Sequence, residues 1–268
     1  MSISGRLVRA SRDATQNQVQ PVPIKFTAKH LLLDIEGTTS SVSYVFEVLF
    51  PYVRERLKNF LEIQWEQKDV VRVCEQIAKD AGARSFQEWC GSVSEKPARI
   101  QKVIGEINRL MDGDVKATGL KELQGLIWRD GFIGGELRAH VYPDVPLALK
   151  RWKDAGFDIR IYSSGSIEAQ KLFFAHTEAG DLLKFFNGHY DTTSGSKKTA
   201  ESYRTIAANI DAAPRDILFA SDIVAELDAA EQAGVQTVLV VRSGTVPPAH
   251  GGHAVIKSFD EIVLSAKS

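Results

Sequence analysis

The 268-residue chain has little of what marks a secreted, membrane-bound or nucleic-acid-binding protein. Its two cysteines, Cys74 and Cys90, are too few for a disulfide framework or a four-thiolate zinc site. No run approaches the roughly 18 apolar residues of a membrane span, and the first residues contain no apolar stretch of the kind found in secretory signals, so we do not expect a cleaved signal. Lys and Arg number 33 against 34 Asp and Glu, so no net field favours nucleic acid or an anionic membrane. We therefore expect a reduced, cytoplasmic protein without nucleic-acid or membrane partners, and leave open a nuclear location.

The composition is that of a folded globular protein, with 44% hydrophobic and 25% charged residues. The length fits one large domain or two small ones. Residues 1–24 differ from the rest, because they combine three arginines with several Ser and Gln and form only a thin helical apolar face. We interpret them as a flexible N-terminal extension, with a weak organellar presequence as the alternative.

Short apolar runs that end in polar residues alternate with helical patterns in two parts of the chain. The first run starts at His30 and ends in Asp34 and Glu36. Two later runs end in Ser163-Ser164 and in Asp222, and residues 235–241 form another run. Strands that alternate with helices predict an α/β fold, a doubly wound parallel sheet, built from residues 25–44 and 136–268.

Residues 45–135 show only helical periodicity, which predicts an inserted all-helical cap domain. Its first helix, from Tyr44 to Gln64, should be broken or kinked near Pro51. The glycines of residues 131–135 predict a hinge out of the insert.

Three acidic residues follow predicted strands, namely Asp34, Glu36 and Asp222. Ligands of open parallel sheets bind at the carboxyl ends of the strands, so these carboxylates should meet there. An oxygen-rich site of this kind suits Mg²⁺. The structural alternative for Asp34 and Asp222 is helix capping or turn formation.

Two further elements suit a phosphate group. Ser163 and Ser164 open a predicted helix, whose N-terminus binds anions, although simple capping explains serines there equally well. Lys197, in a loop rich in Ser, Thr and Gly, has an ammonium group that could reach the phosphate, whereas a lone loop lysine is usually solvated. The Gly-rich segment around His250 and His253 is read as a flexible loop rather than a metal site.

At this point a family resemblance becomes specific. The segment Leu33 to Thr39, with its Asp34-Ile35-Glu36-Gly37 tetrad, resembles the first motif of the haloacid dehalogenase superfamily. Glu36 stands where most phosphatases of the superfamily have a second Asp. Together with residues 49–52, 162–166 and 188–192, it resembles the bifunctional enolase-phosphatases of methionine salvage, the acireductone synthases.

The resemblance implies a Mg²⁺-dependent reaction in two steps. A small phosphorylated substrate, 2,3-diketo-5-methylthiopentyl-1-phosphate, would be enolised and then dephosphorylated to the acireductone. Asp34 would be the nucleophile, with Glu36 as a second catalytic residue. Asp34, Glu36 and Asp222 would bind the metal.

The substrate and its phosphate would be bound by Ser163, Ser164 and Lys197. Whether Glu36 is a direct ligand or an acid/base stays open, and so does the enolisation base. The family also suggests a monomer. The alternatives are another small-molecule phosphatase or phosphomutase of the superfamily, or a catalytically silent binding module.

Overall fold

The computed structural model describes residues 23–243, 249 and 251–265. Residues 1–22 lie outside this range, so the expected N-terminal extension is almost wholly beyond what the structure describes. Within the described range, no helix combines the length and the apolar character that a bilayer crossing requires.

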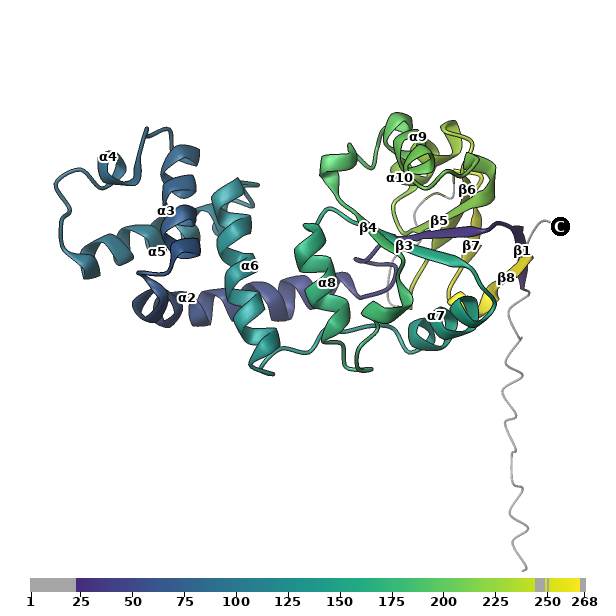
Figure 1. Ribbon diagram of the computed structural model, residues 1–268, viewed down its shortest axis with the longest axis horizontal. Coiled ribbons are helices and arrows are strands. Elements are labelled where there is room, and N and C mark those ends of the chain that lie inside the picture. Colours follow the sequence, from purple (N-terminus) through teal and green to yellow (C-terminus); the bar gives the residue numbers. More distant parts are fainter. Residues whose placement is uncertain (1–22, 244–248, 250, 266–268) are drawn as a thin grey trace, which may run out of the picture.

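A parallel six-stranded sheet forms the centre of the α/β region (Figure 1), which is the predicted fold class. Its strand order is β4-β3-β2-β5-β6-β7. A separate parallel pair joins β1 to β8. The strands are β1 (Ile24–Thr27), β2 (His30–Leu33), β3 (Asp158–Tyr162), β4 (Gly188–Tyr190), β5 (Ile217–Ser221), β6 (Gln236–Val240), β7 (Ala254–Ile256) and β8 (Ile262–Ser265).

Helices cover both faces of the sheet because successive side chains of a strand point to opposite faces. In β2, Leu31 and Leu33 join one buried cluster and Leu32 joins another. The first cluster includes residues of α7 (Asp144–Asp154) and α8 (Ile167–Ala175). The second includes residues of α9 (Ala200–Asn209) and α10 (Val224–Gln232). The sheet is therefore doubly wound, with two hydrophobic layers.

The helices between β2 and α7 extend away from the sheet (Figure 1), although Tyr44 and Leu49 at their start still belong to the first buried cluster of the sheet. These helices are α1 (Val42–Tyr44), the π-helix η1 (Val45–Leu49), α2 (Phe50–Gln64), α3 (Lys68–Asp80), α4 (Phe86–Cys90), α5 (Lys96–Asp112) and α6 (Thr118–Ile133). We call α2 to α6 the helical region. Its buried apolar residues, among them Leu57, Val73 and Ile107, form a hydrophobic cluster of their own. The division into core and cap at residues 45 and 135 stays a proposal.

The helix predicted to be broken or kinked near Pro51 changes its pitch there. From Val42 to Gln64 the chain stays helical, but η1 inserts a π-helical turn immediately before α2, which has Pro51 in its first turn. Proline has no N–H to donate, and the first positions of a helix tolerate that loss. The π-helical turn is thus the local form of the predicted irregularity.

The prediction of a flexible loop around His250 and His253 was wrong at His253. That side chain is buried, with Nδ1 2.8 Å from the hydroxyl of Thr237 and Nε2 3.0 Å from a carboxylate oxygen of Asp228. These bonds join the start of β7 to β6 and α10. A buried imidazole needs such partners, and a glycine-rich sequence does not reveal them. His250 itself lies outside the described residues.

Candidate active site

Three strands of the sheet end level with one another. Leu33 of β2 pairs with Ile161 of β3 on one side and with Ala220 of β5 on the other. The polar residues that follow these strands therefore come to one place, which we call the sheet edge. Asp34 is tied to it by its backbone N–H, which donates to the carbonyl of Ala220 at 3.0 Å.

The segment after Asp34 is folded tightly around one carbonyl group. The backbone N–H groups of Thr38, Thr39 and Ser40 all lie within 3.2 Å of the carbonyl oxygen of Ile35. The hydroxyl of Thr39 also donates to the carbonyl of Asp34 at 3.1 Å. This segment is closed by its own hydrogen bonds, which fixes the direction in which Asp34 leaves the strand.

Gly37 brings this segment against Asp222. Its φ of +73° lies in the left-handed region, where glycine is favoured. A Cβ atom at Gly37 would lie 2.0 Å from Oδ2 of Asp222, so no other residue fits here without displacing that carboxylate. Asp222, which follows β5, thus packs against the same segment that carries Asp34 and Glu36.

Lys197 is the cation of the sheet edge. Its side chain is only 8% exposed, and Nζ lies 2.7 Å from Oδ1 of Asp34 and 2.6 Å from Oε2 of Glu226. The hydroxyl of Tyr203 donates to the Lys197 carbonyl at 2.7 Å, which holds the backbone at this point. The neighbouring Lys198 is exposed. Of the two adjacent lysines, the structure therefore brings Lys197 to Asp34.

The pKa values of the site reflect a surplus of negative charge. Burial and the nearby charge of Asp34 raise the pKa of Asp222 to about 7. The same two causes raise the pKa values of Glu36 and Glu226, although Lys197 opposes both shifts. Burial favours the neutral form of Lys197, but Asp34 and Glu226 outweigh it and raise its pKa. Four carboxylates thus lie near one buried ammonium group, which contacts two of them, Asp34 and Glu226.

This donor set suits a divalent cation. Its oxygen atoms are hard ligands, and burial, followed by the charge of Asp34, raises the pKa of Asp222, so that a bound cation would favour its ionised form. In the part of the chain that the structure describes, no three Asp, Glu, His or Cys side chains are placed so that they could hold a metal ion together. Mg²⁺ usually keeps several water ligands and can be bound through only one or two carboxylates, so a site at this edge does not depend on such a group of three.

The two predicted serines lie in the turn between β3 and α8. Ser163 is buried and its hydroxyl accepts from the N–H of Gly165 at 3.3 Å, whereas Ser164 is exposed. The buried amide of Gln170 donates to the carbonyls of Gly165 and Tyr190, at 2.8 Å each. The turn is therefore held rigidly, with Ser164 at the surface.

Glu226 was not assigned to the site from the sequence. It lies in the first turn of α10, four residues after Asp222, and its carboxylate accepts from the hydroxyl of Ser221 at 3.0 Å. The spacing in the sequence could have indicated this residue, because an acid one helical turn after an acid at a strand end lies near the same edge of the sheet. The contact with Lys197 depends on how the loop folds back, which spacing does not reveal.

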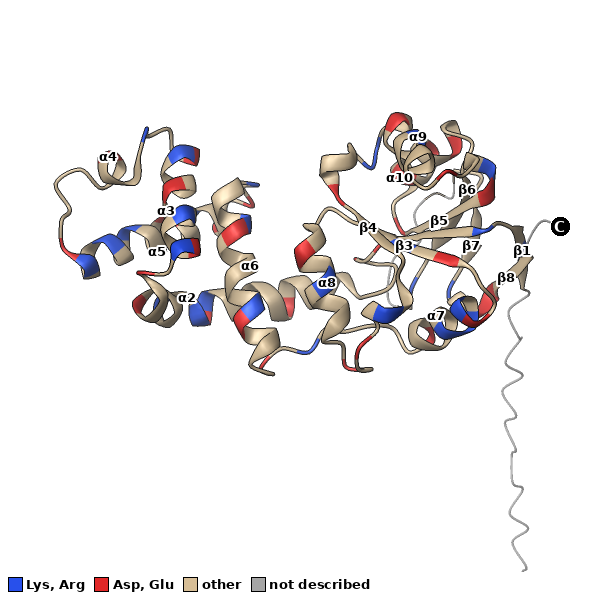
Figure 2. Ribbon diagram, in the orientation of Figure 1, with Lys and Arg blue, Asp and Glu red and all other residues tan. Residues whose placement is uncertain are grey.

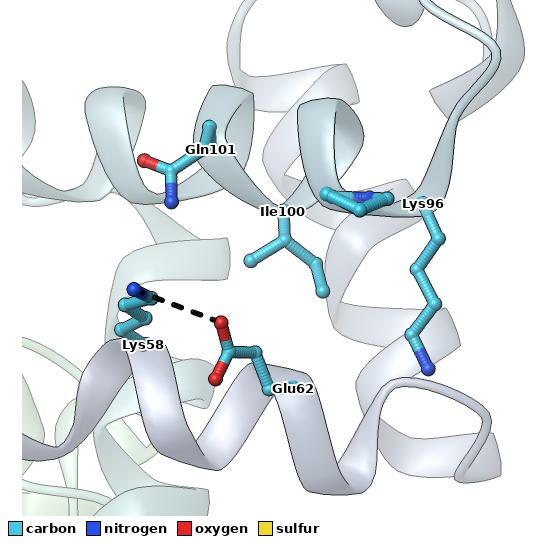
Figure 3. Close-up of a pocket in the computed structure, with 6 residues that line it drawn as sticks. Lys58, Glu62, Lys96, Ile100 and Gln101 are labelled. Carbon is cyan, nitrogen blue, oxygen red and sulfur yellow. Dashed lines mark ion pairs between the residues drawn. The ribbon is translucent and has the colours of Figure 1, made fainter.

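A hollow between α2 and α5 is separate from these residues (Figure 3). It has a volume of about 290 Å³, and none of the predicted site residues lines it. Its lining residues are Lys58, Glu62, Lys96, Pro97, Ile100 and Gln101. Lys58 and Glu62 form a loose ion pair there, with Nζ and Oε1 3.9 Å apart. The hollow is lined by none of the residues predicted to bind the substrate or to catalyse the reaction.

Known proteins resemble this chain over most of its length. A family model of haloacid dehalogenase-like hydrolases matches residues 28–234. Enolase-phosphatase E1 of Synechococcus elongatus is 44% identical over 246 residues, which cover 90% of this chain and 100% of that protein. Enolase-phosphatase E1 of Pseudomonas syringae is 46% identical over 231 residues, or 86% and 95% of the two chains. The chain belongs to the enolase-phosphatase E1 family of haloacid dehalogenase-like hydrolases.

Solved structures share the fold of this chain. The UTR4 protein of Saccharomyces cerevisiae superposes with a TM-score of 0.71 at 32% identity, over 87% of this chain and 99% of that one. CbbY of Rhodobacter sphaeroides, at 13% identity and a TM-score of 0.52, shares the fold alone. As a member of the enolase-phosphatase family, the chain is an enzyme of the phosphatase class.

Proposed function

We propose that this enolase-phosphatase converts 2,3-diketo-5-methylthiopentyl-1-phosphate to 1,2-dihydroxy-3-keto-5-methylthiopentene and phosphate in methionine salvage. The observation that carries the proposal is the buried contact of Lys197 with Asp34, at 2.7 Å, beside three further acids at the sheet edge. Family membership supplies the expected substrate. The other residues of the edge then have distinct roles.

Asp34 is proposed as the nucleophile that takes the phosphoryl group. A carboxylate attacks phosphorus effectively only when it is held in line with the leaving oxygen, and the closed segment from Ile35 to Ser40 would hold Asp34 in that position. Lys197 would stabilise the negative charge that spreads over the phosphoryl oxygens. Ser163 and Ser164 would hold the phosphate and the substrate at the start of α8.

The proposed metal is Mg²⁺, bound by Asp34, Glu36 and Asp222. Once bound, it would neutralise phosphoryl charge and polarise the oxygen atoms of the dicarbonyl group. Because desolvation and the charge of Asp34 raise its pKa, Glu36 suits a residue that exchanges protons as well as a ligand. The base of the enolisation step stays open among the groups at the edge.

We also propose a partner, an oligomeric state and a location for the enzyme. Its partner is a small phosphorylated molecule, and we propose that it acts as a monomer in the cytoplasm. The relatives give no support for a nuclear location. The helical region would act as a cap that excludes water when substrate is bound.

The test is an assay of the purified enzyme on the diketo phosphate. Absorbance of the enol and release of phosphate are followed together, with and without excess chelator. We expect the enol signal to precede phosphate release, and both to disappear in chelator. Phosphate release without an enol signal would identify a different phosphatase of the same superfamily, and full activity in chelator would exclude the metal.

A further inference from the structure

A buried arginine connects the segment after Asp34 to three other parts of the chain. Arg242, two residues after β6, is 3% exposed. Its guanidinium carbon lies 4.3 Å from the ring centre of Tyr142 and 4.8 Å from that of Phe259. Two aromatic rings therefore hold the guanidinium plane, and its donors point in fixed directions.

The two ends of this guanidinium group bind different partners. Nε donates to the carbonyl of Thr38 at 2.8 Å, and Thr38 belongs to the closed segment that follows Asp34. Nη1 donates to Oδ2 of Asp144, the first residue of α7, at 2.7 Å. One side chain thus joins the nucleophile's segment to the start of a helix on the sheet.

Asp144 is itself held from the other side. The same Oδ2 accepts from the backbone N–H of Phe259 at 2.6 Å and from the hydroxyl of Ser258 at 3.2 Å. Arg242 also donates to the carbonyl of Lys257 at 3.3 Å. The carboxylate is therefore a fixed anchor for the guanidinium group, and through it for the carbonyl of Thr38.

We propose that Arg242 is a positioning residue for phosphoryl transfer, which holds the backbone after Asp34 so that the carboxylate stays in line with the phosphorus. This inference rests on the proposed function. Arginine suits the role because its planar fork bonds two partners on different sides at once. A lysine keeps the charge but has a single nitrogen, which cannot reproduce both bonds in the same geometry.

Arg151 offers a matched control. It also bonds the C-terminal segment, with Nη2 3.1 Å from the carbonyl of Phe259 and Nη1 3.3 Å from Asp260. No contact of Arg151 reaches the segment from Asp34 to Ser40 among the hydrogen bonds of the described residues. Loss of the Arg151 side chain would loosen the same C-terminal segment, but the bond from Arg242 to the carbonyl of Thr38 would remain.

The experiment compares Arg242→Lys with Arg151→Lys by steady-state kinetics on the diketo phosphate, at a temperature where both are folded. We expect Arg242→Lys to lower kcat by at least about tenfold with KM nearly unchanged, because in-line placement matters in the transition state. Arg151→Lys should change neither constant by more than about twofold. Guanidinium ion added to Arg242→Ala should restore part of kcat.

Other results of this comparison would contradict the positioning role of Arg242. Equal kcat values for the two lysine variants, with only a lower Tm for Arg242→Lys, overturn the positioning role and leave a structural one. If the unsubstituted chain releases no phosphate, the proposed function fails and this inference with it. If Arg242→Lys does not fold, Asp144→Asn tests the same pair, since it keeps the acceptor oxygen and removes the charge. It should lower kcat by at least about threefold, and an unchanged kcat contradicts the proposal.

Discussion

Ion pairs of the helical region lie on the surface, whereas those of the sheet edge lie inside the protein. Arg72 and Glu122, which link α3 to α6, have side chains that are 59% and 31% exposed. Lys197 and Asp34 are 8% and 7% exposed. Figure 2 shows acidic and basic residues interspersed along the outer helices. Water screens such pairs, so they add little stability, while a buried pair depends entirely on its partners.

The comparison teaches where each part of the molecule derives its stability. The helical region relies on an apolar cluster, and its charges serve mainly to keep its surface hydrated. At the sheet edge, charged groups are buried away from water. This burial destabilises the folded state unless each charge has a partner that compensates for the lost hydration. Such an arrangement is expected where charge must act on a substrate.

The largest effect is expected from Asp34→Asn. The substitution preserves shape but removes the nucleophile, so phosphate release should fall by at least about a thousandfold while the fold stays intact. Phosphate assay and circular dichroism measure the two properties. The control is Asp154→Asn, an exposed carboxylate paired with Lys150 at the end of α7. Substantial residual turnover in Asp34→Asn excludes Asp34 as nucleophile.

Lys197→Met should be the most destabilising of these changes. It leaves Asp34 and Glu226 buried without their counter-cation, a loss of about 3–5 kcal/mol in the free energy of unfolding. The matched change Arg72→Met breaks an exposed pair and should cost less than about 1 kcal/mol. Denaturant titration of both variants measures the difference. Equal losses in the free energy of unfolding would contradict the difference between the buried ion pairs of the sheet edge and the exposed ion pairs of the helical region.

Ile107→Ala tests the helical region. Ile107 is fully buried in its apolar cluster, and truncation should lower the free energy of unfolding by about 2–4 kcal/mol. Because Ile107 belongs to a cluster separate from the sheet edge, kcat per folded molecule should change by less than about twofold. A large fall in kcat, with folding intact, would mean that the packing of this region controls the chemistry.

The smallest effect concerns pH. In the folded chain the pKa of Asp222 is about 7, above the 3.8 of the ordinary side chain. Ionisation is thus unfavourable in the folded state, and without a divalent cation the stability of the chain decreases as pH rises from about 4 to 7. Asp222→Asn carries no such charge. The Tm of Asp222→Asn, measured in chelator, should therefore rise relative to the Tm of the unsubstituted chain as the pH is raised from 4.5 to 8.

A difference in Tm between these two chains that does not vary with pH would contradict the burial of an ionisable Asp222. Adding Mg²⁺ to the unsubstituted chain should raise its Tm more at pH 8 than at pH 4.5, because only the ionised carboxylates bind the cation.

Local patterns in the sequence were sufficient for the strand ends and the sheet type. Apolar runs that stop at Asp34 and Asp222 mark the ends of β2 and β5, and the structure aligns them. Short edge strands such as β4 and β7 were missed because three residues carry too little periodicity. The contact between Lys197 and Glu226, and the bond from Arg242 to Thr38, join segments whose meeting depends on tertiary folding. No residue spacing encodes these distances.

The most direct test of the account is to identify the residue that takes the phosphoryl group. The enzyme is mixed with the diketo phosphate and Mg²⁺, quenched in acid within one turnover, reduced with borohydride and mapped by peptide mass spectrometry. An aspartyl-phosphate would be reduced to homoserine, and the account predicts homoserine at position 34 alone. Homoserine at another position, or an unmodified Asp34 in enzyme that turns over, would contradict it.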